Sequence, residues 1–404
     1  MKDLFCKGVR LTDRSALMER TITSWTPSRV VVPLLPTGIG RVPVGTSVKK
    51  GALLGEEGGF APENGVVTEY REISHPLLGK VLCAVMELRP KKRKSKSHPY
   101  ALEGAHNQTD ILQAVRQAGI INESTGEPLW KELKNWAEEK PSYVAIDLLE
   151  DDPLCAAGAS LFVSDREKAF RGMEYLADVL PGISRKIMWN SSWMEENQGR
   201  LPNKYGLRLQ DRYPAWELHL QQTKDHGVRM GAQALIAMTE AVEEGKPQTH
   251  TIVMVSGESL VCPGMYWVPI GTPVGDLLEY CGAGARPCQA VMGAAMTGQA
   301  VLDPDVPIVP ASRGITVWTP QAVQLDDRVF PCIGCGKCQS ACPKGLEPWM
   351  VQEALGLDPI PTHMLWRVEE CSQCGVCRAV CPSRIDLTAC MKQAVELRKR
   401  GGLA

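Results

Sequence analysis

Short apolar runs interrupted by glycine and proline occupy the first 88 residues. Apolar residues cluster at 28–35, 48–55, 65–70 and 79–88, with turn residues such as Pro36, Gly38 and Pro62 between them. Runs of this length between turn signals are typical of β-strands. The pattern predicts an N-terminal β module over residues 1–88. Residues 89–106 are rich in Lys and Arg and predict a basic, solvated linker, with contact to an acidic partner or to phosphates as the alternative.

Residues 107–250 alternate helical and extended patterns. Apolar residues recur with helical spacing over 110–119, 166–180 and 230–242, whereas 143–149 is a short continuous apolar run. Such alternation is typical of domains in which helices cover a sheet. We therefore predict a Rossmann-like α/β domain over residues 107–250.

The pattern changes again after residue 250. Apolar stretches at 251–257 and 264–273 predict a hairpin, and 274–281 predicts a helix. A small α+β unit is therefore expected over 251–300, a connecting segment over 301–330 and a cysteine-rich unit over 331–404. A multidomain α/β chain agrees with a length of 404 residues, because domains usually contain roughly 100–200 residues.

Composition narrows the classes of function. Lys and Arg number 45 against 46 Asp and Glu, so no general basic field favours nucleic acid as a partner. No apolar run approaches the roughly 18 residues that span a bilayer, and the first residues show no apolar secretory core. We expect a soluble, cytoplasmic protein with no transmembrane segment and no nucleic-acid partner.

The cysteines carry the clearest chemical signal. Eight of the 15 fall in two runs, 332–342 and 371–381, each spaced C-x2-C-x2-C-x3-C and followed by proline. Bacterial two-cluster ferredoxins have this spacing, and the fourth cysteine of each run binds the cluster of the other run. Two [4Fe–4S] clusters are predicted, one held by Cys332, Cys335, Cys338 and Cys381 and the other by Cys371, Cys374, Cys377 and Cys342. Two all-cysteine zinc sites are the alternative, which four thiols in one short run disfavour.

Helical patterns surround the two runs. Segments 347–356, 361–368 and 387–400 each predict a helix, so residues 331–404 are expected to form an α-helical dicluster ferredoxin domain. His363 and Cys390 are candidates for further ligands, but ordinary core or surface positions are preferred for both.

The ordered set of motifs resembles a known family. Segments 31–34, 38–40 and 48–54 are similar to an N-terminal barrel-like module, and 255–257, 263–266 and 269–274 to a soluble-ligand-binding β-grasp (SLBB-type) domain. With the two cysteine runs, the chain resembles the C subunit of the Rnf ferredoxin–NAD oxidoreductase. That family is related to the NADH-binding flavoprotein subunit of complex I, to cobalamin reductases and to proline reductase-associated electron-transfer proteins.

The chain departs from the family in the loop that would hold flavin. Relatives that bind flavin and NADH carry a loop resembling G-x-G-G-A-G-F-P-T, where glycines let backbone N–H groups approach phosphate. Here Asn122, Ser124 and Thr125 place side chains in that approach, and Glu123 and Glu127 are expected to repel a phosphate. We therefore expect no bound FMN.

Other elements of the family's flavin site are also altered. The E-x-E-P segment persists at 150–153, where the resemblance makes Glu150 and Asp152 remnants of a flavin site. Segment 227–232 lacks the family's Asn, and 213–217 lacks its glycines. We interpret Glu150 and Asp152 as surface or structural acids in preference to a retained nucleotide-binding role.

These observations predict an iron–sulfur protein that relays single electrons between a reduced donor and a partner redox enzyme or complex. An FMN-dependent NADH dehydrogenase or cobalamin reductase-type subunit is the alternative, and a structural subunit stabilised by its clusters is a third. Protein redox partners in an electron-transfer complex are expected. Peripheral association with a membrane complex and formation of a homo-oligomer are both compatible with this interpretation.

Overall fold

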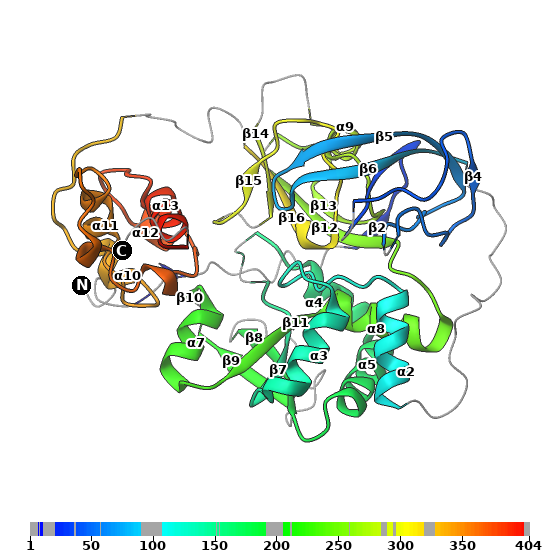
Figure 1. Cartoon of the computed structure of the whole chain (residues 1–404), viewed down its shortest axis with the longest axis horizontal. Helices are drawn as coiled ribbons and strands as arrows, with labels where there is room; N and C mark the ends of the chain where they lie inside the picture. The colour runs from blue at the N-terminus through cyan, green and yellow to red at the C-terminus, as the bar shows by residue number, and fades with distance from the viewer. Residues whose placement is uncertain are drawn as a thin grey trace.

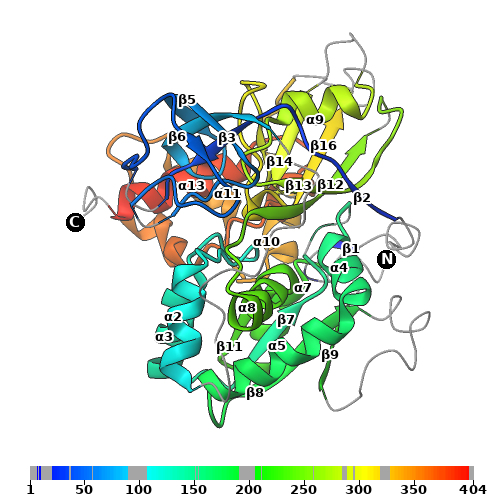
Figure 2. The same cartoon turned by 90° about the vertical axis from the view of Figure 1, so that its right-hand side faces the viewer.

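The structure is a computed structural model that describes residues 7, 9–10, 21–35, 38–56, 58–89, 107–150, 152, 154–190, 205–210, 212–257, 259–283, 289–293, 296–318 and 328–399. Two β-rich units lie above an α/β layer, and a helical C-terminal unit lies at one end (Figure 1). Figure 2 shows the α/β layer below the other sheets. Except for Arg89, the predicted basic linker lies outside the described residues.

The N-terminal β unit is an antiparallel sheet of order β3-β6-β5-β4. Val30 and Val32 pack into its own core, whereas Val31 between them packs against the neighbouring sheet. Both faces are therefore covered, which explains the unbroken apolar run in β3. The strands are β3 (Arg29–Pro33), β4 (Ser47–Val48), β5 (Gly65–His75) and β6 (Gly79–Leu88).

A six-stranded mixed sheet of order β15-β14-β16-β12-β13-β2 forms the second β unit. The predicted hairpin is present as β12 (His250–Gly257) and β13 (Gly264–Pro269), and α9 (Val274–Tyr280) follows it. Two strands come from segments predicted to lie elsewhere. β2 (Ile22–Ser24) pairs in parallel with β13, and β16 (Gly314–Trp318) pairs in parallel with β12. The remaining elements are β14 (Gln289–Gly293), β15 (Gln299–Ala300) and the 3₁₀ turn η3 (Pro310–Ser312).

These two strands correct the predicted organisation. Segment 301–330 was expected only to connect two domains, and residues 1–88 were expected to form one module. Each segment instead supplies a strand to the six-stranded sheet. Parallel pairing between segments so distant in sequence leaves no periodic signal in either segment, so the pattern of apolar residues cannot reveal it.

The α/β layer contains a parallel sheet of order β11-β7-β8-β9. Asp147 ends β7 and Gly231 ends β11, so both lie at the carboxyl edge of the sheet, where open α/β folds place their ligands. The strands are β7 (Tyr143–Asp147), β8 (Ser184–Asn190), β9 (Gly206–Leu209) and β11 (Gly227–Gly231). The helices are α2 (Gln108–Gln117), α3 (Leu129–Glu139), α4 (Ala157–Ser164), α5 (Arg166–Val179) and α8 (Ala232–Glu244).

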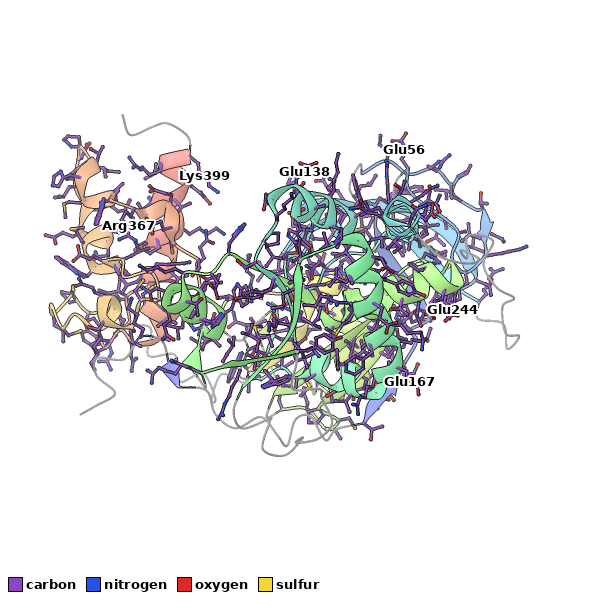
Figure 3. All side chains as sticks on the ribbon, turned by 90° about the horizontal axis from the view of Figure 1, so that it is seen from below. Glu56, Glu138, Glu167, Glu244, Arg367 and Lys399 are labelled. Carbon is purple, nitrogen blue, oxygen red and sulfur yellow. The ribbon has the colours of Figure 1, made fainter. Side chains whose placement is uncertain are left out.

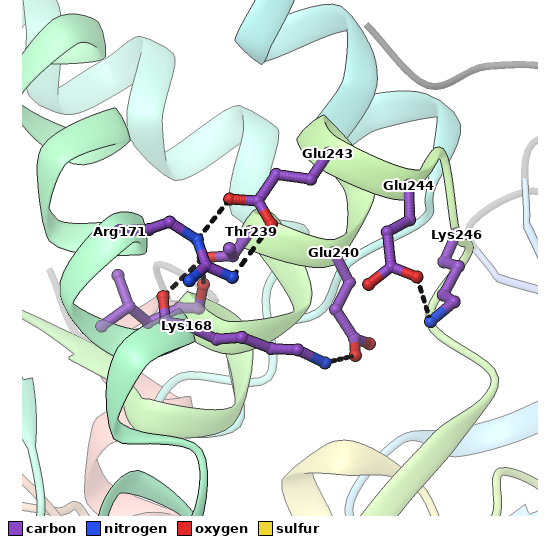
Figure 4. A network of polar contacts seen from close by, with 8 residues as sticks. Lys168, Arg171, Thr239, Glu240, Glu243, Glu244 and Lys246 are labelled. Atoms are coloured by element: carbon purple, nitrogen blue, oxygen red, sulfur yellow. Dashed lines mark hydrogen bonds and ion pairs between the residues drawn. The ribbon is translucent and has the colours of Figure 1, made fainter.

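A polar seam fixes α8 against α5 (Figure 4). Lys168 pairs with Glu240, and Arg171 Nε donates to Glu243 at 2.6 Å. Gly172 allows the close approach, because a Cβ there would meet the Thr239 hydroxyl at 2.7 Å. These contacts fix the C-terminal half of α8 against α5.

The C-terminal unit has a core of its own, which includes Leu346, Val351, Leu365, Val368 and Met391. The predicted helix over 361–368 consists instead of two 3₁₀ turns. Figure 3 shows this unit, with Arg367 and Lys399 labelled, at one end of the molecule. Its elements are α10 (Lys337–Ala341), α11 (Pro348–Ala354), η4 (Thr362–Leu365), η5 (Val368–Glu370), α12 (Val376–Ala379) and α13 (Leu387–Lys399).

A short strand and a helix lie between the C-terminal unit and the α/β layer (Figure 1). They are β10 (Arg212–Tyr213), which pairs with β1 (Val9–Arg10), and α7 (Ala215–Thr223). None of the helices within the described residues combines the length and apolar character needed to cross a membrane.

Candidate metal centre

The two cysteine runs fold into the same local shape. In each, the first two cysteines precede a short helix, α10 or α12, and the third lies within it. The backbone turns with positive φ at equivalent positions of the two runs, at Gly334 and Gln373 and then at Gly336 and Gly375. These turns let a short loop carry three thiols toward one point.

Each of two cavities is lined by cysteines from both runs. The outer cavity, of about 210 Å³, is lined by Cys332, Cys335, Cys338 and Cys381. The inner cavity, of about 20 Å³, is lined by Cys342, Cys371, Cys374 and Cys377. The structure thus brings together the two sets of four thiols that the crossed assignment predicts. The inner cavity has the smaller volume of the two.

The donor chemistry of both sets suits iron–sulfur clusters, which take thiolate ligands. In the inner set, the Cys342 sulfur accepts the Leu346 N–H at 3.3 Å, and the Cys371 sulfur accepts the Gln373 N–H at 3.4 Å. Burial raises the pKa of Cys377 to about 12, so a cluster held there would displace the proton of this thiol. Among the described residues, no three His, Cys, Asp or Glu side chains are placed to hold a single metal ion.

The inner cavity faces the rest of the molecule. The Tyr213 hydroxyl, from β10, donates to the Cys374 carbonyl at 2.6 Å. Lys344 pairs with Glu217 of α7 at 2.6 Å. The backbone at Gly375 also lies so close to the Met296 carbonyl that a Cβ would be 2.6 Å from its oxygen. Sequence reasoning treated 213–217 only as an altered flavin segment and missed this contact.

The outer cavity faces solvent. Cys332 and Cys335 are exposed, and the neighbouring Ile333 and Phe330 are 68% and 48% exposed. His363 is exposed and Cys390 half-buried, and neither lines the inner or the outer cavity.

The acids predicted as flavin-site remnants are buried. Glu150 and Asp152 are 4% and 3% exposed, so of the two predicted alternatives the surface position is wrong, and a structural role stays a prediction. The Arg313 guanidinium reaches across from the six-stranded sheet and donates to the Glu150 carbonyl at 2.9 Å. Burial raises the pKa of Glu150, and the charge of Arg313 opposes the shift. Asp147, which sequence reasoning also missed, accepts the Glu150 N–H at 2.9 Å. An acid at the end of an apolar strand run was the available signal.

The altered flavin loop turns two of its side chains inward. Asn122 is fully buried and Glu123 is 5% exposed, whereas Glu127 is exposed. The Ser124 hydroxyl lies 3.4 Å from Asp147. The expectation that all five polar side chains project toward a ligand is therefore wrong for Asn122 and Glu123, because both find backbone partners inside the fold.

Comparisons with known proteins identify two domains. The family model of the 4Fe-4S dicluster domain matches residues 331–385, and that of the SLBB domain matches residues 252–298. Both predicted domain types are thereby confirmed within a mixed α/β chain.

Curated relatives match most of the chain. The C subunit of the ion-translocating oxidoreductase complex of Yersinia enterocolitica is 27% identical over 80% of this chain and 51% of its own length. The C subunit of the proton-translocating ferredoxin:NAD(+) oxidoreductase complex of Clostridium ljungdahlii is 27% identical over 80% of this chain and 78% of its own. The chain is similar in sequence to these C subunits. The resemblance drawn from the ordered motifs is thus confirmed.

The chain spans only about half the length of the Yersinia protein. The same holds for the corresponding C subunit of Serratia proteamaculans, which is 25% identical over 80% of this chain and 50% of its own. An NAD⁺-reducing [NiFe]-hydrogenase is similar in structure with a TM-score of 0.47, 16% identity, and coverage of 76% of this chain and 63% of its own.

Proposed function

We propose that this protein relays single electrons through two [4Fe–4S] clusters between a reduced donor and a partner redox complex. The observation that carries the proposal is the pair of cavities, each lined by three cysteines of one run and the fourth of the other. When bound, such clusters accept and donate one electron at a time. The protein's part is to hold both sets of thiols and to orient them.

The two sets of ligands are proposed to have different neighbours. Cys332, Cys335, Cys338 and Cys381 would hold a cluster near solvent, where Ile333 and Phe330 offer exposed apolar surface to a redox partner. Cys371, Cys374, Cys377 and Cys342 would hold the other against α7 and β10, where Tyr213 and Glu217 fix the C-terminal unit. The cluster held by the first set would thus exchange electrons with an external partner. The names of the relatives support assembly into a larger oxidoreductase complex, with attachment at the periphery of a membrane complex as the finer proposal.

The rival function, an FMN-dependent NADH dehydrogenase or cobalamin reductase, requires a site for the flavin phosphate. Asn122 and Glu123 instead fill their part of the loop with contacts to the protein's own backbone. We therefore propose that no stoichiometric FMN binds and that the isolated protein does not oxidise NADH. Glu150 and Asp152 then act as structural acids.

Anaerobic purification tests the relay directly. We expect about eight iron and eight sulfide per chain and a reversible loss of cluster absorption with dithionite. About two zinc with negligible iron would overturn the cluster assignment. Clusters that dithionite cannot reduce would favour the structural alternative. Flavin near one equivalent after acid release, with bleaching by NADH, would favour the rival enzyme.

Paired substitutions test the crossed ligands. If Cys342 serves the cluster of the second run, C342S/C371S removes ligands from one cluster only and should retain about four iron per chain. C342S/C332S removes ligands from both and should retain far less. Cys390→Ser and Cys262→Ser are controls that keep the full content. A higher iron content in C342S/C332S than in C342S/C371S would show that each run holds its own cluster.

A further inference from the structure

A buried carboxylate binds the N-terminus of α8. One oxygen of Glu123 accepts the Gln233 N–H at 2.6 Å, and the other accepts the Ala234 N–H at 3.0 Å. Glu123 is 5% exposed and comes from a loop far away in sequence. The helix has 13 residues, and its N-cap, Gly231, has no side chain with which to cap it. Glu123 therefore supplies the cap from outside the helix.

Two neighbouring residues keep this carboxylate in place. A Cβ at position 231 would lie 1.9 Å from the carboxyl carbon of Glu123, so glycine there provides the space that the carboxylate fills. Asn122 accepts the Gly231 N–H at 2.9 Å and donates to the Arg229 carbonyl at 3.1 Å and to Glu132 at 2.7 Å. The loop is thus attached to the end of β11, and Glu123 is directed at the helix.

The position is one that favours an anion on physical grounds. The first N–H groups of a helix have no partner within the helix, and the helix dipole makes this end positive. α8 also begins at the carboxyl edge of the parallel sheet, directly after β11, where α/β folds hold phosphate groups. A carboxylate with two N–H donors satisfies the same groups that a phosphate would use.

We propose that the N-terminus of α8 is an oxyanion site whose built-in occupant is the Glu123 carboxylate, and that this contact closes the site to the phosphate of a nucleotide or flavin. Glu123 thus excludes a phosphate by taking its place, in addition to any repulsion by its charge. The proposal is independent of the clusters, so either can fail without the other.

Glu123→Ala tests the proposal by emptying the site. Thermal unfolding is measured at pH 8, which lies above the pKa of about 7 to which burial raises Glu123. Stability in sodium formate or sodium phosphate is compared with stability in sodium chloride at equal ionic strength. Formate restores the lost carboxylate, and phosphate is the proposed class of excluded ligand. Raising either anion from 1 to 100 mM should increase the folding equilibrium constant of E123A by about tenfold or more beyond its effect on wild type.

Two further variants make the result specific. Glu123→Gln removes the negative charge but keeps the side-chain volume. E123Q should therefore be destabilised, and neither anion should rescue it, because the side chain still fills the site. Glu127→Gln changes an exposed carboxylate of the same loop and should behave as wild type. Equal effects of the anions on E123A, E123Q and wild type would overturn the proposal, as would no effect on any of them. If E123A folds in none of the buffers, the stabilities of E123Q and E127Q are compared. A lower stability of E123Q supports the proposal, and equal stabilities overturn it.

Discussion

Removal of one hydroxyl should loosen the C-terminal unit from the α/β layer. Tyr213 is 4% exposed, and its hydroxyl donates to the Cys374 carbonyl at 2.6 Å. Tyr213→Phe keeps the ring, which packs against Ala341 and Val376, and removes only the donor. The carbonyl it leaves belongs to a residue of the inner set of cysteines.

The size of the effect follows from the environment of this bond. A neutral hydrogen bond contributes about 1 kcal/mol, and a buried carbonyl left without its donor costs about 1–3 kcal/mol. A loss of about 1–2 kcal/mol corresponds to roughly a 5- to 30-fold shift toward the undocked state. The ion pair of Lys344 with Glu217 remains, so complete separation is not expected.

Hydrogen exchange on the cluster-loaded protein measures this shift. Peptides covering α7 and α12 should exchange faster in Y213F, and the electron paramagnetic resonance signal of one reduced cluster should change. Tyr266→Phe is a matched control, because Tyr266 is also 4% exposed and its hydroxyl also donates to a cysteine carbonyl, that of Cys262, at 2.6 Å. Unchanged exchange in Y213F, or equal changes in both variants at these peptides, would refute the reasoning.

Two further predictions use other contacts of the fold. Gly375→Ala should impair docking and cluster retention more than Gly336→Ala: both positions have positive φ, but only a Cβ at 375 meets a backbone atom, the Met296 oxygen at 2.6 Å. Equal iron content and stability of the two variants would contradict this. Burial lowers the pKa of His75 to about 4, and its Nδ1 accepts two backbone N–H groups while its Nε2 contacts the Pro307 carbonyl at 3.0 Å. The unfolded chain therefore binds a proton below about pH 6.5 that the native ring resists, and the free energy of unfolding should fall by about 2 kcal/mol from pH 8 to pH 5. His75→Gln should remove this part of the pH dependence. Urea titrations at several pH values measure it, and a free energy of unfolding that depends on pH equally in H75Q and wild type would disprove the prediction.

Local pattern was sufficient for much of this protein. The apolar spacing predicted β7, α5, α8 and α13 to within a few residues, because each buries one face or one run against a neighbour. The spacing of the cysteines predicted a dicluster domain, since two-residue gaps and a trailing proline are local requirements of a loop around a cluster. The order of weak motifs was enough to indicate the similarity to these C subunits.

Tertiary structure alone decided how these parts meet. It placed β2 and β16 in the six-stranded sheet, and it set the inner cysteines against Tyr213. It also turned Glu123 inward, where a residue expected to repel a phosphate instead caps α8. Each of these contacts joins segments distant in sequence. A single side chain that pairs with a distant backbone group leaves no periodic trace, so only the packed fold reveals whether a carboxylate faces solvent or the end of a helix.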